Sequence, residues 1–200
     1  MNKLHRICGL ILVCFVGIHL FNHLCSLLGA DAHLAVMQQL RKVYRNPFVE
    51  TVLLMAVVLQ IISGLSFVFS KQKNKWKSCA KWQVCSGFYL AVFLFIHVGA
   101  VLAGRFILEL DTNIYFGVAG LNSFPANLFF IPYYTLAIAA FFMHLAALHA
   151  QRMHKNIAGV SVALQTKLLI ITGVLIAFAV LYGMTNGFRG LPLPAAYNIF

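Results

Sequence analysis

Long apolar runs recur along this chain and are separated by short polar segments. A helix needs about 20 consecutive apolar residues to cross the hydrocarbon core of a bilayer, and charges inside these runs are almost absent. The pattern therefore predicts an all-α integral membrane protein, a single domain over residues 1–200 with five transmembrane helices. We place these helices near 7–29, 48–70, 83–104, 129–151 and 167–187.

The segment between the first two runs has a different pattern. Within residues 30–47, apolar side chains recur at helical spacing, which predicts an amphipathic helix lying on the outer membrane surface. The apolar positions are Leu34, Val36, Met37, Leu40 and Val43. Two prolines, Pro47 and Pro132, are expected to mark helix starts, where proline is well tolerated.

Composition agrees with a membrane protein. The chain is 62% apolar and 10% charged, whereas soluble domains average about 45–50% and about 25%. The net charge of +11 does not indicate nucleic-acid binding, because the basic residues lie in short loops and form no aromatic-interleaved face. The five cysteines include no Cys-x-x-Cys pair, so we interpret them as small apolar packing residues.

Basic residues are distributed unequally between the two sides of the membrane. With the N-terminus inside, the inner side carries Lys3, Arg6, Lys71, Lys73, Lys75, Lys77, Lys81, Arg152, Lys155 and Lys167. The outer side then carries Arg41, Lys42, Arg45, Arg105 and Arg189. The positive-inside rule favours this orientation, with the C-terminus outside. We expect the first run to be a retained helix, because it exceeds the about 7–15 apolar residues of a signal peptide.

Histidines stand inside three of the apolar runs, where an imidazole without a partner costs free energy. His19 and His23 lie one helical turn apart in the first run, His97 lies in the third and His144 in the fourth. At about 1.5 Å per residue, His19 lies roughly 20 Å and His97 roughly 24 Å above the basic inner ends of their runs. These two therefore share a height in the outer half, whereas His144 lies roughly 12 Å from the inner face.

Two neutral imidazoles at one height on two helices are what bis-histidine haem ligation requires. We regard His19 and His97 as candidate axial ligands, with His23, one turn away on the same side, as the alternative to His19. Two other interpretations stay open, namely hydrogen bonds between helices and a histidine proton relay in a small transporter. The histidines at helix ends or in loops, to which we assign no role, are His5, His33 and His154.

A short pattern recurs in the inner halves of four helices. A small residue is followed by glycine and an apolar residue at Cys8-Gly9-Leu10, Ser63-Gly64-Leu65, Ser86-Gly87-Phe88 and Thr172-Gly173-Val174. Small residues allow close helix packing in lipid, which is the simpler interpretation. The alternative interpretation is that they make room for a flat macrocycle.

Three of the runs together resemble the single-chain, five-helix cytochrome b membrane anchor of succinate:quinone and fumarate:quinone oxidoreductases. The first, CGLILVCFVGIHLF with a later LLG, is similar to that family's Gly-Leu start, ligand His and trailing Leu-Leu-Gly. The third, WQVCSGFYLAVFLFIHV, is similar to its Trp, Ser/Thr-Gly-Phe and His pattern. The fourth, PYYTLAIAAFFMHLAALHAQR, is similar to its Pro, aromatic, His and trailing basic end.

The resemblance assigns roles to three histidines. His19 and His97 match the axial pair of the outer haem b, and His144 matches one ligand of an inner haem. The family's partner for the latter lies on the second helix, but TVLLMAVVLQIISGLSFVFS contains no histidine. Ser63 lies near the height of His144 and Gln60 one turn further out, and neither is a usual haem ligand. We therefore expect one haem b; a second haem, a lone-ligand role for His144 and a hydrogen bond from it to quinone stay open.

The resemblance also implies a function. Electrons would pass between an iron–sulfur subunit, accompanied by a flavoprotein, and quinone in the cytoplasmic (inner) membrane, with haem as relay. The lysine-rich segment 71–81 would contact a soluble partner or, more simply, anionic lipid headgroups. The chain has no nucleotide loop, no nucleophile with its base and no paired carboxylates, so any enzyme activity would belong to a complex. The alternative is a stand-alone membrane protein on the same bundle, with one haem or none.

Overall fold

The computed structural model describes residues 3–69 and 78–200, and in these ranges the regular structure is helical. Five of the described helices are long and apolar enough to cross a membrane, which confirms the prediction of an all-α protein with five spans. They are α1 (Lys3–Leu24), α3 (Pro47–Val68), α4 (Ser78–Phe106), α6 (Asn127–Arg152) and α7 (Val162–Met184). Part of the lysine-rich segment, residues 70–77, lies outside the described residues, and the remainder, 78–81, begins α4 instead of forming a loop.

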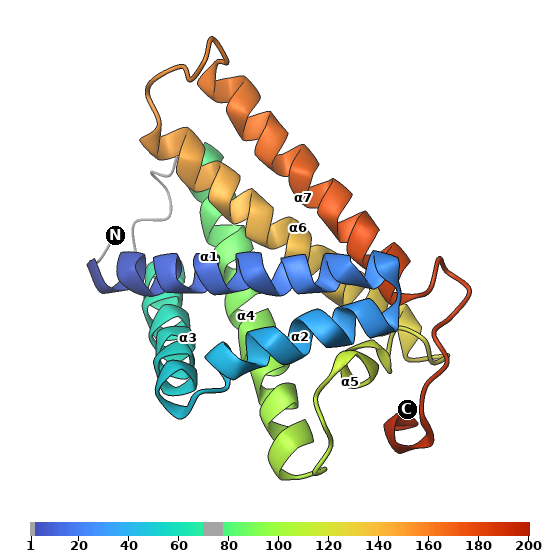
Figure 1. Ribbon diagram of the computed structural model, residues 1–200. Helices are drawn as coiled ribbons and strands as arrows, with labels where there is room; N and C mark the ends of the chain where they lie inside the picture. Colours follow the sequence, from blue (N-terminus) through green and yellow to red (C-terminus); the bar gives the residue numbers. More distant parts are fainter. Residues whose placement is uncertain (1–2, 70–77) are drawn as a thin grey trace.

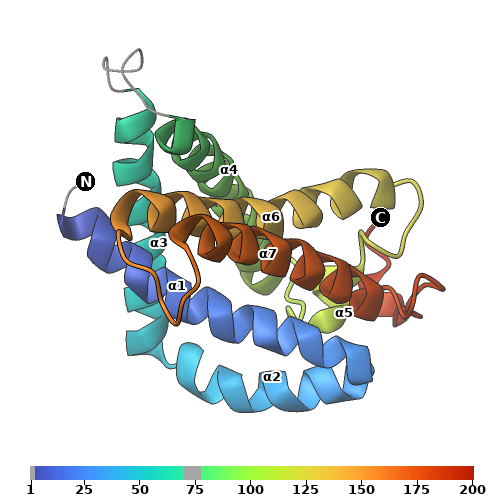
Figure 2. The same cartoon turned by 90° about the horizontal axis from the view of Figure 1, so that it is seen from above.

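The five long helices form a ring. Each packs mainly against two others, in the order α1, α3, α4, α6, α7 and back to α1. Figure 1 shows α1 in front of α4, with α3 to one side and α6 and α7 to the other. The turned view of Figure 2 shows the two chain ends at opposite ends of the bundle. Because α1 packs closely against neither α4 nor α6, helix packing leaves the middle of the ring open.

The helix ends follow local capping rules, with one departure from the prediction. The Asn46 side chain accepts a hydrogen bond from the backbone N of Phe48 at 3.1 Å, and Pro47 is the first residue of α3, where its missing N–H costs little. Pro132, expected at a helix start, lies inside α6, five residues after Asn127. That prediction was wrong because a proline so near the N-terminus removes only one backbone hydrogen bond, which allows the helix to begin before it.

The segment after α1 folds back on the bundle. The short turn η1 (Cys25–Leu28) ends at Gly29, whose φ of 103° lies in the region that favours glycine. Helix α2 (Ala30–Tyr44) then runs back beside α1, as Figure 1 shows, and buries His33 and Met37. The predicted helix is therefore present, and it is packed against the bundle through this face.

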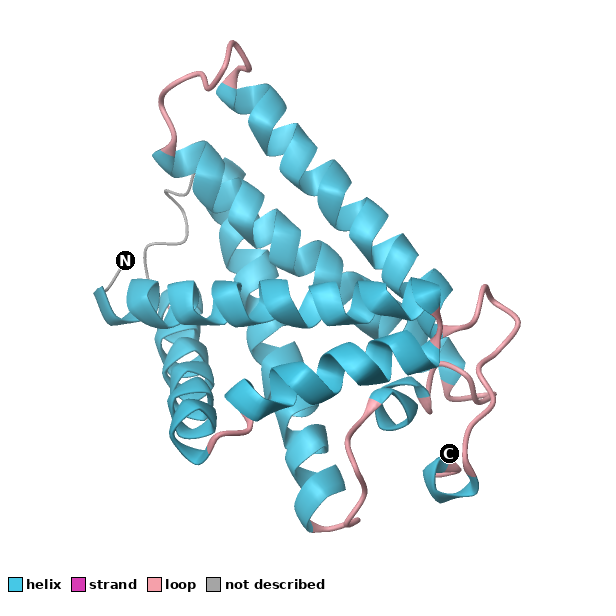
Figure 3. Cartoon of the chain, viewed as in Figure 1, coloured by secondary structure: helices cyan, strands magenta, loops and turns pink. Residues whose placement is uncertain are grey.

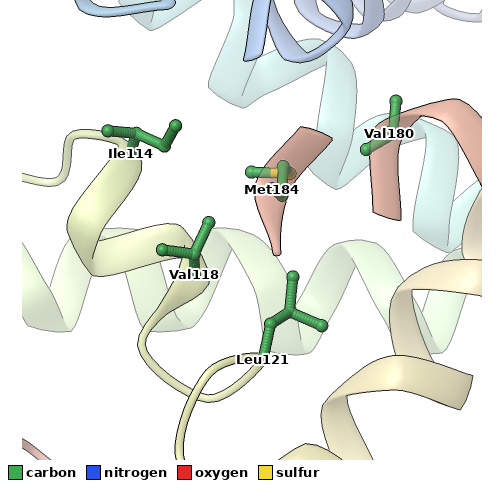
Figure 4. Packing of buried hydrophobic residues seen from close by; sticks show 5 residues of the cluster. All are labelled: Ile114, Val118, Leu121, Val180 and Met184. Carbon is green, nitrogen blue, oxygen red and sulfur yellow. The ribbon is translucent and has the colours of Figure 1, made fainter. Parts of the chain in front are cut away.

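One end of the ring is closed by short elements. Helix α5 (Ile114–Val118) and the residues after it pack against the end of α7 in the apolar cluster that Figure 4 shows. The cluster comprises Ile114, Val118, Leu121, Val180 and Met184. Figure 3 shows the loops gathered at the ends of the long helices. This buried cluster therefore lies at the end of the bundle remote from the N-terminus.

The outer surface of the ring is apolar. Large hydrophobic side chains that are more than half exposed occur on every long helix, for example Phe21 (59%), Ile62 (62%), Phe95 (72%), Phe129 (56%) and Leu175 (63%). Contiguous apolar surface of this kind is rare on soluble monomers and suits contact with lipid chains. The exposure pattern agrees with a multi-pass membrane protein.

Candidate functional site

A cavity of about 1510 Å³ lies within the ring of helices. All five long helices line it, mostly with aliphatic and aromatic side chains, and it also receives His5, His19, His23, His97, His144 and His149. Most ligand pockets measure about 300–1,000 Å³, so this cavity is large even for a bound cofactor. We infer that the cavity accommodates a large ligand.

Two of the predicted histidines face each other across this cavity. The ring centres of His19, on α1, and His97, on α4, lie 6.2 Å apart with an angle of 68° between the ring planes. Two imidazoles bound to opposite sides of one metal ion by bonds of about 2 Å have ring centres roughly 6 Å apart. The spacing between His19 and His97 is therefore the spacing that shared axial ligation demands.

A phenylalanine one turn earlier supports each of these rings. Phe15 stacks on His19 with ring centres 5.7 Å apart, and Phe93 stacks on His97 with centres 5.0 Å apart. Residues four apart on a helix lie on one face, so each contact restricts the orientation of the imidazole. Tyr134 of α6 also meets the His97 ring edge-on at 6.2 Å.

The two rings differ in their hydrogen bonds. Among the described residues, no hydrogen bond joins a nitrogen of His97 to another group, and the ring borders the cavity. His19 Nε2 lies 3.0 Å from Nε2 of His23. An intramembrane imidazole without a polar partner is costly, which favours a ligand for His97 in the cavity.

His23 continues the contact of His19 toward α2. His23 Nδ1 lies 3.3 Å from Nε2 of His33, and the same His33 nitrogen lies 3.3 Å from the Asn22 amide nitrogen. Burial, together with the smaller effect of the nearby positive charge of Arg41, lowers the pKa of His33 to about 4. His33 is therefore neutral near pH 7, and the side chains form a continuous polar path from the cavity to α2.

His144 lies in another part of the cavity, nearer the N-terminal end of α1. Its Nδ1–H donates to the backbone carbonyl of Gln83 at 3.0 Å and lies 3.3 Å from Ser86 Oγ. Both partners belong to α4. The ring packs over Gly87, where a Cβ would come within 3.1 Å of His144 Cε1. The structure therefore does not join His144 to the His19–His97 pair.

The sequence analysis missed the role of His5. This ring is buried, with 8% of its surface exposed, and its Nδ1 lies 2.8 Å from Ser63 Oγ on α3. Its Nε2 accepts a hydrogen bond from the Gln60 amide at 3.2 Å. Ser63 and Gln60, which we compared with a missing ligand, thus hold a histidine supplied by α1. The signal was the spacing of 14 residues between His5 and His19, which places both rings within about 40° on one helix face.

Charged groups lie at the other end of the cavity. Arg45, Glu50 and Arg105 line it, and Arg105 is ion-paired with Glu50. Asp111 anchors the same region through a contact of 2.8 Å with Arg41. Since Arg105 lies eight residues after His97 on α4, this polar group is about 12 Å further along the helix.

Within the described residues, no group of three or more His, Cys, Asp or Glu side chains is arranged to hold a bare metal ion. A haem iron needs only two axial ligands from the protein, because the porphyrin supplies the other bonds. Comparisons with protein-family models, with curated proteins and with solved structures each found no match. Function is therefore inferred from the residues of this chain and their geometry.

Proposed function

We propose that this chain is a haem-b protein of a membrane electron-transfer system, with His19 and His97 as the axial ligands of one haem. The observation that carries the proposal is the pair of imidazoles 6.2 Å apart across the cavity, on two helices that are not neighbours in the ring. Haem, when bound, supplies reversible one-electron exchange at its iron.

The surrounding residues suit this group. Phe15 and Phe93 orient the two imidazoles, and the apolar walls exclude water, which influences the reduction potential. Ligation through His19 Nε2 would replace its hydrogen bond to His23. His23 would then retain its contact with His33 as a neighbour of the site.

At a finer level, we propose a role as the membrane anchor of a succinate:quinone or fumarate:quinone oxidoreductase-like complex in the cytoplasmic membrane. The three sequence motifs support this proposal. The cavity groups Arg45 and Arg105 add hydrogen-bond donors suited to quinone carbonyl oxygens. Purification under mild conditions tests it: iron–sulfur and flavoprotein subunits should accompany the chain, whereas isolation alone with full haem would support a stand-alone redox protein.

The ligand assignment is tested by measuring haem content as the pyridine haemochrome. His19→Ala and His97→Ala should each lower the haem content by one per chain, because each removes one axial ligand. His154→Ala is the matched control, since this histidine is exposed in the loop after α6. A purified native chain without haem, or full haem in both cavity variants, would refute the proposal. If His23→Ala loses haem and His19→Ala does not, the ligand on α1 is His23, one turn away from His19.

The second candidate function is a proton relay. The continuous contacts from His19 through His23 to His33 favour it, since imidazoles both accept and donate protons. Proteoliposomes with an entrapped pH dye discriminate between the two functions. A haem-free chain that conducts protons, with conduction lost in His23→Ala, would replace the electron-transfer proposal.

A further inference from the structure

A second pair of histidines lines the same cavity. His5 comes from α1 and His144 from α6, two helices that do not pack closely together. Both rings line the cavity, and each lies against a glycine of α3 or α4, two helices that pack on one another. On α1, His5 lies 14 residues before His19, which corresponds to roughly 21 Å along the axis. The two pairs are therefore at different depths of one cavity.

A Ser-Gly pair on a neighbouring helix contacts each of the two imidazole rings, His5 and His144. On α3, Ser63 Oγ donates to the Leu59 carbonyl at 2.5 Å and so accepts from His5 Nδ1–H. The next residue is Gly64, at which a Cβ would lie 3.7 Å from His5 Cε1.

On α4, the pair Ser86-Gly87 repeats this arrangement for His144. Ser86 Oγ donates to the Trp82 carbonyl at 2.7 Å, which leaves its lone pairs free to accept from His144 Nδ1–H. Two of the four small-Gly patterns in the sequence thus hold histidines. Another, Gly173, packs against Phe142 and serves helix contact.

These hydrogen bonds determine which nitrogen of each ring can act as a ligand. A proton fixed on Nδ1 leaves the lone pair on Nε2, which is the usual second-shell arrangement of metal-bound histidine. His144 Nε2 makes no hydrogen bond in the described part of the chain. His5 Nε2 contacts only the Gln60 amide, whose oxygen is buried without a partner, so a ligand has one hydrogen bond to replace.

The cavity has room for two large groups. Ligand pockets usually measure about 300–1,000 Å³, and this one measures about 1510 Å³. We propose that His5 and His144 are the axial ligands of a second haem, held by Ser63 and Ser86. This inference rests on the proposed function, because it requires that the chain binds haem. In this assignment His5, on α1, takes the place of the histidine that α3 lacks.

Haem stoichiometry tests this inference. The native chain should bind two haems, and His5→Ala and His144→Ala should each retain one, with His154→Ala as the two-haem control. One haem that is lost in His97→Ala but kept in His5→Ala and His144→Ala would overturn this inference and leave the proposed function standing. No haem at all would overturn both. Two haems in either His5→Ala or His144→Ala would show that another residue is the ligand, and would overturn the assignment of His5 and His144.

A variant that loses both haems is resolved by adding imidazole. Free imidazole should occupy the space left in His5→Ala and restore the second low-spin electron paramagnetic resonance signal. The variant must first show the native helix content. If imidazole then fails to restore this signal, His5 is not a ligand.

The serines should act as positioning residues. Ser63→Ala removes the hydrogen bond from His5 Nδ1–H and should raise the midpoint potential of one haem only, because the imidazole becomes a weaker donor. Ser86→Ala should raise the potential less, because His144 Nδ1–H keeps its shorter hydrogen bond to the Gln83 carbonyl. Ser66→Ala is the matched control, since Ser66 Oγ bonds only the Ser63 carbonyl. Unchanged potentials in both serine variants would contradict this assignment.

Discussion

Individual residues acquire their roles here through contacts between helices that are distant in sequence. The depth estimate placed His19 and His97 at one height, and the structure brings their rings together. His5 was missed because its partners, Ser63 and Gln60, lie more than 50 residues away. His33 was missed because the return of α2 along α1, which buries it, depends on the turn at Gly29.

Close packing at Gly183 gives a prediction at the residue scale. A Cβ at this position on α7 would lie 2.3 Å from Ser26 Oγ and 2.9 Å from the backbone N of Leu27. Gly183→Ala should therefore destabilise the fold by about 1–3 kcal/mol, or roughly 2–12 °C in Tm for a chain of this size. Thermal unfolding in detergent measures the shift.

Gly99 provides the control for this substitution. A Cβ there would meet nothing within 4 Å, and alanine has the higher helix propensity. Gly99→Ala should therefore keep the native Tm or raise it. Equal Tm values for Gly183→Ala and the native chain would show that α7 does not pack against η1 as closely as described.

At the scale of the elements, the apolar runs were sufficient to predict five long helices, because the length of an apolar span is set by the bilayer. The boundaries moved by several residues. α4 begins at Ser78 and α6 at Asn127, before the predicted starts, because helices extend into the polar flanks that hydropathy discounts. How the helices associate depends on side-chain packing, which hydropathy does not encode.

The start of α7 gives a prediction for one element. Ser161 is its N-cap, and the side chain accepts from the backbone N of Leu164 at 3.3 Å. Ser161→Ala should cost about 0.5–2 kcal/mol and lower the Tm measured in detergent. Ser161→Asp retains an acceptor oxygen and should preserve the Tm. An unchanged Tm in Ser161→Ala would indicate that this end of α7 is frayed.

At the scale of the whole molecule, five spans arranged as a ring produce one cavity that six histidines share. Side chains from facing helices of such a ring can hold a flat ligand between them. The closed end, where α5 packs on the end of α7, holds one buried apolar cluster, and a second cluster, of Cys8, Leu12 and Ala56, joins α1 to α3 within the ring.

The orientation in the membrane gives a prediction for the whole molecule. The positive-inside rule predicts that the N-terminus faces the cytoplasm and the C-terminus faces outward. Alkaline phosphatase fused after Phe200 should therefore be active, and green fluorescent protein at the same place should be dark. Fusions in the loop between α6 and α7, at His154, should give the reverse pattern. A fluorescent C-terminal fusion would contradict the orientation.

The most direct test of the central claim is a diffraction measurement at the iron absorption edge on crystals of the purified chain. The account predicts an anomalous peak between His19 and His97, about 2 Å from a nitrogen of each ring. A map without an iron peak between these rings, with lipid chains filling the cavity, would contradict it.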